Sequence, residues 1–414
     1  YIMKINRLII CLAALAASII SAVAQNSTVS PYSRFGYGLI SDQANTVQKA
    51  MGGVGIAMRS GRQINFMNPA SYAGMDSLTF LFDMGVDAKI LKTTDGDQKG
   101  DNFTGGLNYI TMQVPITKWL GASAGLIPFS QVGYSFGDEI ANGTDTRSGS
   151  GALNQLYLGF GATPFKGFSL GVNASYLFGT LINDTYVYGT STSLFERVIE
   201  VRDYNLRFGL QYGRDIVPGH RVTVGAVYSP KKSFRGRTYG IKYDVSADQA
   251  PDTIADIRLN GNAQMAETWG VGLNYQWGNR LMAEVDFTYQ PWKKVSFATI
   301  EGFDNSRNFN DRWKVGFGVQ FVNNTRGSWL QRVNYRIGGF YCNDYIKVGD
   351  NSVRERGVSL GFGLPSPWTK TMLNLSFEYR NRQAHPNPLV KENYFVLTLG
   401  VNVNELWFYR NKLR

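Results

Sequence analysis

The sequence predicts an all-β protein: a transmembrane antiparallel β-barrel of about fourteen strands, preceded by an N-terminal plug or hatch segment. Three observations predict this class. From about residue 78 onward, apolar side chains alternate with polar ones or glycine, which gives a barrel wall its two faces. The composition is rich in glycine and aromatic residues, with 46 Gly, 23 Tyr and 25 Phe in 414 residues. The first residues have the pattern of an export signal.

The export signal combines a charged entry, a short apolar run and a small-residue end. Lys4 and Arg7 precede the apolar run, and Ala22-Val23-Ala24 ends it. This order predicts cleavage between Ala24 and Gln25. A transmembrane anchor helix is the alternative interpretation. The run is short for the ~20 residues that a spanning helix needs, and the cleavage pattern follows it directly, so we expect a removed signal peptide.

The alternation is regular in several segments. Residues 268–277 place Trp, Val, Leu and Tyr on one parity and Thr, Gly, Asn and Gln on the other, and the same period runs through 281–289, 373–379 and 394–404. A soluble β-sandwich also alternates. However, these segments are longer than the ~5–6 residues usual in globular sheets. Their apolar parity also ends repeatedly in Trp or Tyr, as an interfacial aromatic girdle requires.

Short and long connections alternate along the chain. The short ones are Thr117–Leu120, Pro164–Gly167, Asp215–His220, Gly278–Arg280 and Leu364–Thr369. The long polar ones are Lys92–Asn102, Gly137–Gly149, Leu181–Val198, Pro230–Ala266, Pro291–Asn310 and Arg382–Lys391. In outer-membrane barrels the short turns are periplasmic and the long loops extracellular. We therefore expect a multi-pass barrel in the cell outer membrane with both termini in the periplasm.

Before the first strand lies a polar region with two motifs. Gly52, Gly53 and Gly55 permit a close approach of backbone to the barrel wall, or a positive φ. In Asn68-Pro69-Ala70, the Asn before Pro is held extended and its side chain fixes a turn. These residues either seat a plug or contact a ligand, and seating is the simpler hypothesis. The expected divisions are a signal peptide (1–24), a plug (25–77), the barrel (78–408) and a basic tail (409–414).

The order G-G-x-G-x-A and then N-P-A before the first strand resembles the hatch of the long-chain fatty-acid transporter family of outer-membrane barrels. The segment Gly125–Ser130 and the ending from Lys391 to Phe408 are similar to divergent members from Bacteroidetes-type bacteria. The resemblance covers the whole chain in architecture and a short stretch in motif. It implies a channel or transporter that takes up hydrophobic or small solutes through an opening in the wall. Some divergent relatives instead serve as partners in larger outer-membrane complexes.

The inward parity departs from a fatty-acid tunnel because it carries charges, namely Glu284, Asp286, Lys314, Glu378 and Arg380. In a hydrated lumen such charges can form ion pairs between strands at little cost in free energy. Placing them against an acyl chain without a partner would cost much more free energy. Two functions therefore remain open. The chain is either a channel for hydrophobic or small solutes, or a non-transporting barrel subunit of a secretion or barrel-assembly complex. The partners expected are outer-membrane lipid, with hydrophobic small molecules in the first case and lipoproteins or other complex subunits in the second.

We expect no enzymatic chemistry. The two histidines, His220 and His385, both lie in turn-like segments and not beside an inward serine. Removal of the signal leaves Cys342 as the one cysteine, so no internal disulfide or cysteine metal site is expected. No cofactor or nucleic acid is implied either. The net charge of +11 is dispersed along an exported chain and suits anionic lipid headgroups.

Overall fold

The computed structural model describes residues 29–140, 143–188, 192–244, 252–258, 263–297, 308–367 and 369–406. The expected signal peptide, its cleavage site at Ala24 and Gln25, and the basic tail lie outside the described residues. Within the described part of the chain, no helix combines the length and apolar character needed to cross a membrane.

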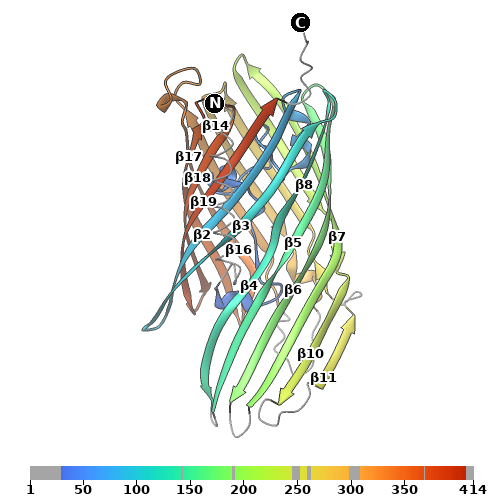
Figure 1. The fold of residues 1–414 in the computed structure, drawn as a ribbon, viewed down its shortest axis with the longest axis vertical. Helices are drawn as coiled ribbons and strands as arrows, with labels where there is room; N and C mark the ends of the chain where they lie inside the picture. The colour runs from blue at the N-terminus through green and yellow to red at the C-terminus, as the bar shows by residue number, and fades with distance from the viewer. Residues whose placement is uncertain are drawn as a thin grey trace, which may run out of the picture.

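Fourteen antiparallel strands form a closed barrel (Figure 1), which confirms the predicted fold class and strand number. The wall strands are β2 (Thr79–Asp95), β3 (Gln98–Pro115), β4 (Leu120–Ile140), β5 (Gly143–Phe165), β6 (Phe168–Tyr188), β7 (Thr192–Val217), β8 (His220–Ser229), β13 (Thr268–Trp277), β14 (Leu281–Gln290), β15 (Arg312–Val322), β16 (Asn334–Val348), β17 (Asn351–Pro365), β18 (Met372–His385) and β19 (Lys391–Leu406). Each pairs with the next, and β19 pairs with β2 to close the ring. A closed ring leaves few backbone groups unpaired, as a membrane wall requires.

The two parities of each strand face different surroundings. On β13, Leu273 points outward and is 53% exposed, whereas its neighbour Asn274 points inward and is fully buried. Aromatic side chains pair across strands on the outer face, as Tyr228 and Trp269 do with ring centroids 4.3 Å apart. The outer surface therefore carries an apolar belt with aromatic edges, whereas polar side chains such as Asn274 face the lumen.

Several connections predicted to be long loops are paired strand instead. The regions 92–102, 137–149 and 181–198 continue the ladders of β2–β3, β4–β5 and β6–β7 almost to their tips. The region 230–266 contains β10 (Gly236–Asp244), which pairs with β7, and β11 (Asp252–Arg258). Strands β4–β7, β10 and β11 thus project beyond the barrel rim (Figure 1). These segments lie beyond the apolar belt and mix polar with apolar residues on both faces, so they lack the regular apolar alternation that marks a membrane strand.

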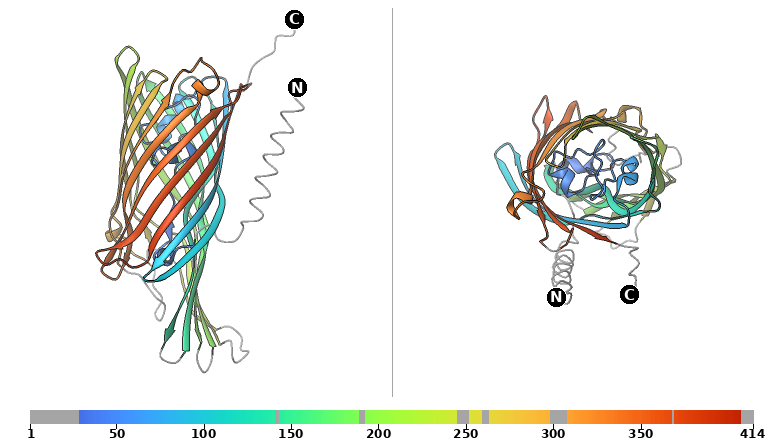
Figure 2. Two further views of the ribbon diagram at one scale, coloured as in Figure 1. Left: turned by 90° about the vertical axis from the view of Figure 1, so that its left-hand side faces the viewer. Right: turned by 90° about the horizontal axis from the view of Figure 1, so that it is seen from above.

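Residues 29–77, which we call the luminal segment, lie inside the barrel (Figure 2, right). Its elements are η1 (Pro31–Arg34), β1 (Leu39–Ile40), α2 (Thr46–Lys49) and η2 (Pro69–Gly74). Helix α2 begins at a capping box in which Asn45 and Gln48 each accept the other's backbone N–H. The remaining short elements are β9 (Lys232–Ser233), β12 (Gln264–Met265), η3 (Trp292–Lys294) and η4 (Leu330–Arg332).

Apolar side chains pack the lumen near both ends of the barrel. We call the end that carries the connections 116–119 and 278–280 the turn end, and the opposite end the loop end. Near the loop end, Tyr37 of the luminal segment packs with Trp292 and Tyr345, all almost fully buried. Near the turn end, Phe66 and Tyr72 belong to a second buried cluster with wall aromatics. The members of both clusters come from segments that are distant in the chain.

Candidate functional site

The barrel wall opens between β3 and β4 in its loop half. These strands pair from Pro115 and Gly121 only as far as Ile110 and Leu126. Beyond that point β3 still pairs with β2, and β4 still pairs with β5. The β2–β3 hairpin and strand β4 therefore separate (Figure 2, left), which leaves a lateral opening in the wall.

Two residues explain where the pairing ends. Strand β3 has a bulge at Asn108, since Gly85 pairs with Tyr109 but Val86 pairs with Leu107. An extra residue of this kind bends a strand and increases its twist. On β4, Pro128 comes two residues after the last partner of β3, and proline has no N–H to donate. The bulge and the proline together stop the ladder at the same level.

The luminal segment takes the place of β3 along the edge of β4. Its short strand β1 pairs with β4. The backbone N–H of Ser41 donates to the carbonyl of Phe129 (2.9 Å), and that of Ser30 donates to the carbonyl of Gly133 (2.6 Å). These hydrogen bonds satisfy backbone groups that the departing β3 leaves without a strand partner.

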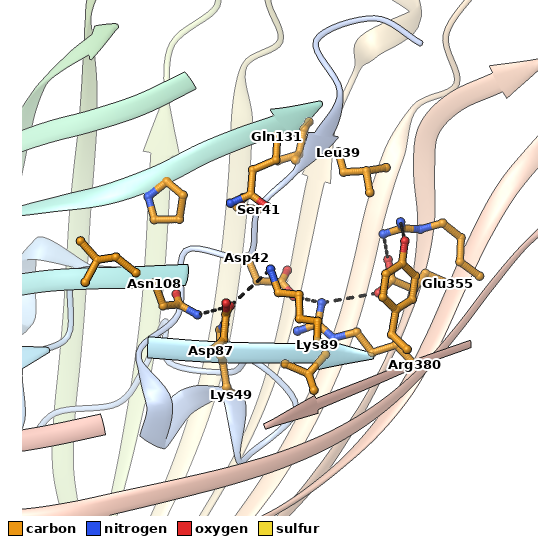
Figure 3. A pocket seen from close by; sticks show the side chains of 16 residues that line it. Leu39, Ser41, Asp42, Lys49, Asp87, Lys89, Asn108, Gln131, Glu355 and Arg380 are labelled. Atoms are coloured by element: carbon orange, nitrogen blue, oxygen red, sulfur yellow. Dashed lines mark hydrogen bonds and ion pairs between the residues drawn. The ribbon is translucent and has the colours of Figure 1, made fainter. Parts of the chain in front are cut away.

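A pocket lies on the inner side of the opening (Figure 3). Its cavity volume of about 90 Å³ gives room for several water molecules, since one needs ~10–15 Å³ of such space. Leu107 of β3 and Pro128 of β4 line it beside the opening. The charged residues in its lining are Asp42, Lys49, Asp87, Lys89, Glu355, Arg380 and Arg382. The route from the opening into the lumen is therefore polar.

Asp42 of the luminal segment joins charges from several wall strands. Its carboxylate lies 2.8 Å from Lys314 Nζ, 3.2 Å from Arg380 and 3.9 Å from Arg312. Burial alone would raise the pKa of the Asp42 carboxyl, but these three cations hold it well below its usual range. Asp42 is thus a charged anchor between the luminal segment and the wall.

The paired carboxylates of β14 hold the luminal segment by its backbone. Asp286 accepts hydrogen bonds from the N–H groups of Gly55 (2.7 Å) and Ile56 (2.9 Å). Glu284 accepts one from the N–H of Ala57 (2.8 Å). Charged acceptors make stronger hydrogen bonds than neutral ones. These lumen carboxyl groups therefore hold a segment that is far away in the chain. The smallest sequence separation between a donor and its acceptor is 227 residues.

The predicted motif residues of the luminal segment lie against the wall. Gly52 has φ +72° and packs on the backbone of Gly339, while Gly53 lies beside the Lys314 ammonium. Pro69 and Ala70 begin η2, and both are buried. None of the six motif residues lines the pocket beside the opening.

Sequence reasoning found Lys314 and the pair Glu378–Arg380 but missed the other charged residues of the cluster. Asp87 and Lys89 share the inward parity of β2, so the alternation contained the signal that places them in the lumen. Asp42 and Lys49 have no such signal, because the luminal segment has no regular period. Their role depends on the position of this segment inside the ring.

Replacing Asn68 by alanine is expected to destabilise the protein by about 2–4 kcal/mol. The fully buried Asn68 accepts a hydrogen bond from the N–H of Ala70 (3.0 Å) and donates to the carbonyls of Ile56 (2.7 Å) and Leu210 (3.1 Å). Alanine leaves the buried N–H of Ala70 without its partner, and the carbonyl of Ile56 keeps only its hydrogen bond from Gln211. Thermal unfolding in detergent measures the loss, and Asn387→Ala at an exposed position serves as the control. Equal midpoints for both variants would show that the turn does not depend on this side chain.

The closed ring of antiparallel strands around an occupied lumen defines a membrane β-barrel, and several solved structures share its fold. The CymD monoaromatic hydrocarbon channel is 13% identical, with 88% of this chain and 98% of that chain covered and a TM-score of 0.61. A Pseudomonas aeruginosa FadL homologue is 12% identical (88% and 99% covered, TM-score 0.64). The P. putida toluene transporter TodX is 15% identical (89% and 100% covered, TM-score 0.62).

The family assignment is more specific than the fold. The BamG family model matches residues 3–414, so the chain belongs to the BamG family. No curated protein matches this sequence.

Proposed function

We propose that this protein is an outer-membrane channel for hydrophobic or small solutes, which pass through the opening between β3 and β4. The opening is the observation that carries the proposal, because it joins the lumen to the apolar belt. The solved structures with the same fold include a monoaromatic hydrocarbon channel and a toluene transporter, which supports this function. In this proposal the loop end faces outward, and both termini lie in the periplasm.

The luminal segment acts as a plug in this proposal. Near the loop end, Tyr37, Trp292 and Tyr345 fill the lumen, so a solute has no straight path along the barrel axis. Transport then requires a local displacement of the luminal segment or of the connection after β14. The lateral opening lies beside residues 39–42 of the luminal segment, so a small shift of these residues would widen the connection between the lumen and the membrane.

A second candidate is a non-transporting barrel subunit of a larger outer-membrane complex. One observation favours it: β4–β7, β10 and β11 project past the rim as a sheet (Figure 1). Its outer face carries Tyr186, Tyr188 and Tyr243, and exposed tyrosines are frequent in protein interfaces. Solute passage does not require such a sheet. Affinity purification in mild detergent tests this function: stoichiometric lipoproteins or other barrel proteins support it, and a lone barrel contradicts it.

Closing the lateral opening is expected to abolish solute uptake while leaving the barrel folded. Deleting Asn108 removes the bulge of β3, and Pro128→Val restores an N–H on β4, so the two strands can pair further. Uptake of radiolabelled toluene by cells that lack other hydrocarbon channels is the measurement. We expect the double variant to fall to the level of cells without the protein.

The control for this experiment is Pro115→Val, which changes a proline of β3 at the turn end, away from the opening. It should keep wild-type uptake. Wild-type uptake by the closed variant would contradict the lateral route. Absence of uptake by the wild-type protein would contradict the channel function itself and favour the complex subunit.

A further inference from the structure

We propose that the outer face of the projecting sheet binds a basic segment of a protein partner, and that a lysine or arginine side chain of this segment lies between the carboxylates of Asp184 and Glu196. The inference rests on the second candidate function, the complex subunit, and adds to it a binding site and the chemistry of the partner. It involves neither the lateral opening nor the lumen.

Two carboxylates face each other on the projecting sheet. Asp184 of β6 and Glu196 of β7 are directly opposite partners in the antiparallel ladder. Such positions place the two Cβ atoms ~4.5–5.5 Å apart, and like charges at this spacing destabilise a sheet. Burial and the Glu196 carboxylate together raise the pKa of Asp184 to about 6. Asp184 is therefore still largely ionised near pH 7, and it faces a second carboxylate at close range.

The carboxylate pair has no counter-ion within the described part of the chain. Oδ1 of Asp184 is buried and accepts no hydrogen bond there. Nearby cations contact other groups. Arg237 lies 3.8 Å from Glu200. Lys242 lies over the ring of Phe195. A carboxylate pair without a counter-ion is complementary to a cation that another molecule supplies.

Tyrosine side chains flank the carboxylate pair on the same face. Tyr186 and Tyr243 lie in the adjacent row of the sheet, on either side of Leu194. Tyr188 is 42% exposed and stacks with Tyr186, with ring centroids 6.1 Å apart. The faces of tyrosine rings attract lysine and arginine cations. The carboxylates and the rings together therefore favour a cation over a neutral or an anionic group.

The open position of this face suits an extended segment of a protein. The sheet projects past the barrel rim (Figure 1), so a macromolecule can lie along it without entering the lumen. Among the described residues, no group of at least three acidic, histidine or cysteine side chains is placed to hold a metal ion. Tyrosine side chains contribute much of the contact in protein interfaces. A basic segment on this face would cover the tyrosine rings and place its cation at the carboxylate pair.

Binding of a short synthetic peptide of alternating lysine and serine to the full chain in an uncharged detergent tests the proposal, with a glutamate–serine peptide as the comparison. We expect saturable binding of the lysine peptide at neutral pH and at least about tenfold weaker binding of the glutamate peptide. The chain has a net charge of +11, so its overall charge repels the lysine peptide and cannot account for such binding.

Glu196→Gln should weaken binding of the lysine peptide about tenfold, because it removes one of the two carboxylates. The same change should raise the midpoint of thermal unfolding, because it removes the repulsion with Asp184. Loss of structure would instead lower both the affinity and the midpoint. Asp350→Asn, which removes an exposed carboxylate outside the projecting sheet, should bind the peptide as the wild type does.

Equal affinity for the two peptides, or wild-type affinity in Glu196→Gln, would overturn the proposal. Displacement of the lysine peptide by stoichiometric calcium would also overturn it, because the pair would then be a metal site. A lone barrel in the affinity purification contradicts the complex subunit itself. Absence of peptide binding, with partners still recovered, contradicts only this site, so the two proposals fail in different experiments.

Discussion

Replacing Asp286 by alanine is expected to loosen the luminal segment and to raise the ion conductance of the barrel several-fold. Asp286 accepts the backbone N–H groups of Gly55 and Ile56 in a buried position. Without the carboxylate each donor is left buried and unpartnered, at a cost of about 1–3 kcal/mol per group. The substitution therefore decreases the free-energy difference between the native arrangement and an arrangement in which the luminal segment has moved and water fills the lumen. Single-channel recording in planar bilayers measures the change.

Two further variants make this result specific. Asp286→Asn keeps an acceptor oxygen but loses the charge, so its conductance should lie between that of the wild type and that of the alanine variant. Asp350→Ala removes a carboxylate from an exposed loop-end turn and should leave conductance unchanged. A closed barrel in Asp286→Ala would show that the other contacts hold the segment without this anchor.

The second large effect is expected for Gly52→Ala, which should lower the stability of the barrel by about 3–5 kcal/mol. Gly52 has φ +72°, a conformation that costs any other residue about 1–2 kcal/mol. A Cβ atom there would also lie 2.5 Å from the carbonyl oxygen of Gly339 and 2.7 Å from that of Phe317. Both neighbours belong to the barrel wall and cannot rotate away. The midpoint of thermal unfolding in detergent measures the loss.

Gly349→Ala is the matched control for this substitution. Gly349 also has a positive φ, +58°, but a Cβ there meets nothing within 4 Å. It should therefore show the backbone cost alone. The difference between the two variants isolates the contact between the luminal segment and the wall, and equal midpoints would mean that the segment shifts to accommodate a methyl group.

The wall of the barrel could be predicted from sequence because one face of each membrane strand meets lipid and the other faces the lumen. Apolar and polar residues therefore alternate along the strand itself. Residues 268–277 and 281–289 coincide with β13 and with all but the last residue of β14. The projecting sheet could not be predicted in this way. Thr185 and Phe195 pair in the part of β6 and β7 that projects beyond the barrel. Both faces of the sheet have similar surroundings there, so the residues on the two parities no longer differ clearly in polarity.

The site was predictable only on its wall side. The inward parity located Glu284, Asp286 and Arg380, and spacing alone could not tell that Asp42 would lie among them. The opening itself depends on two modest signals, Asn108 and Pro128, which become informative once β3 and β4 are known to be neighbours. Contacts between the luminal segment and the wall join residues far apart in the chain, and single-strand patterns carry no information about these contacts.

The enclosure of the luminal segment by a continuous hydrogen-bonded ring imposes an order on assembly. The segment is held by β4 on one side and by β14 on the other, and β19 meets β2 to complete the ring around it. Entering a finished ring would require a folded segment to pass one end of a packed lumen. We therefore expect the luminal segment to pack against the wall strands before the ring is complete. The pairing of β19 with β2 then closes the barrel around a segment that is already bound.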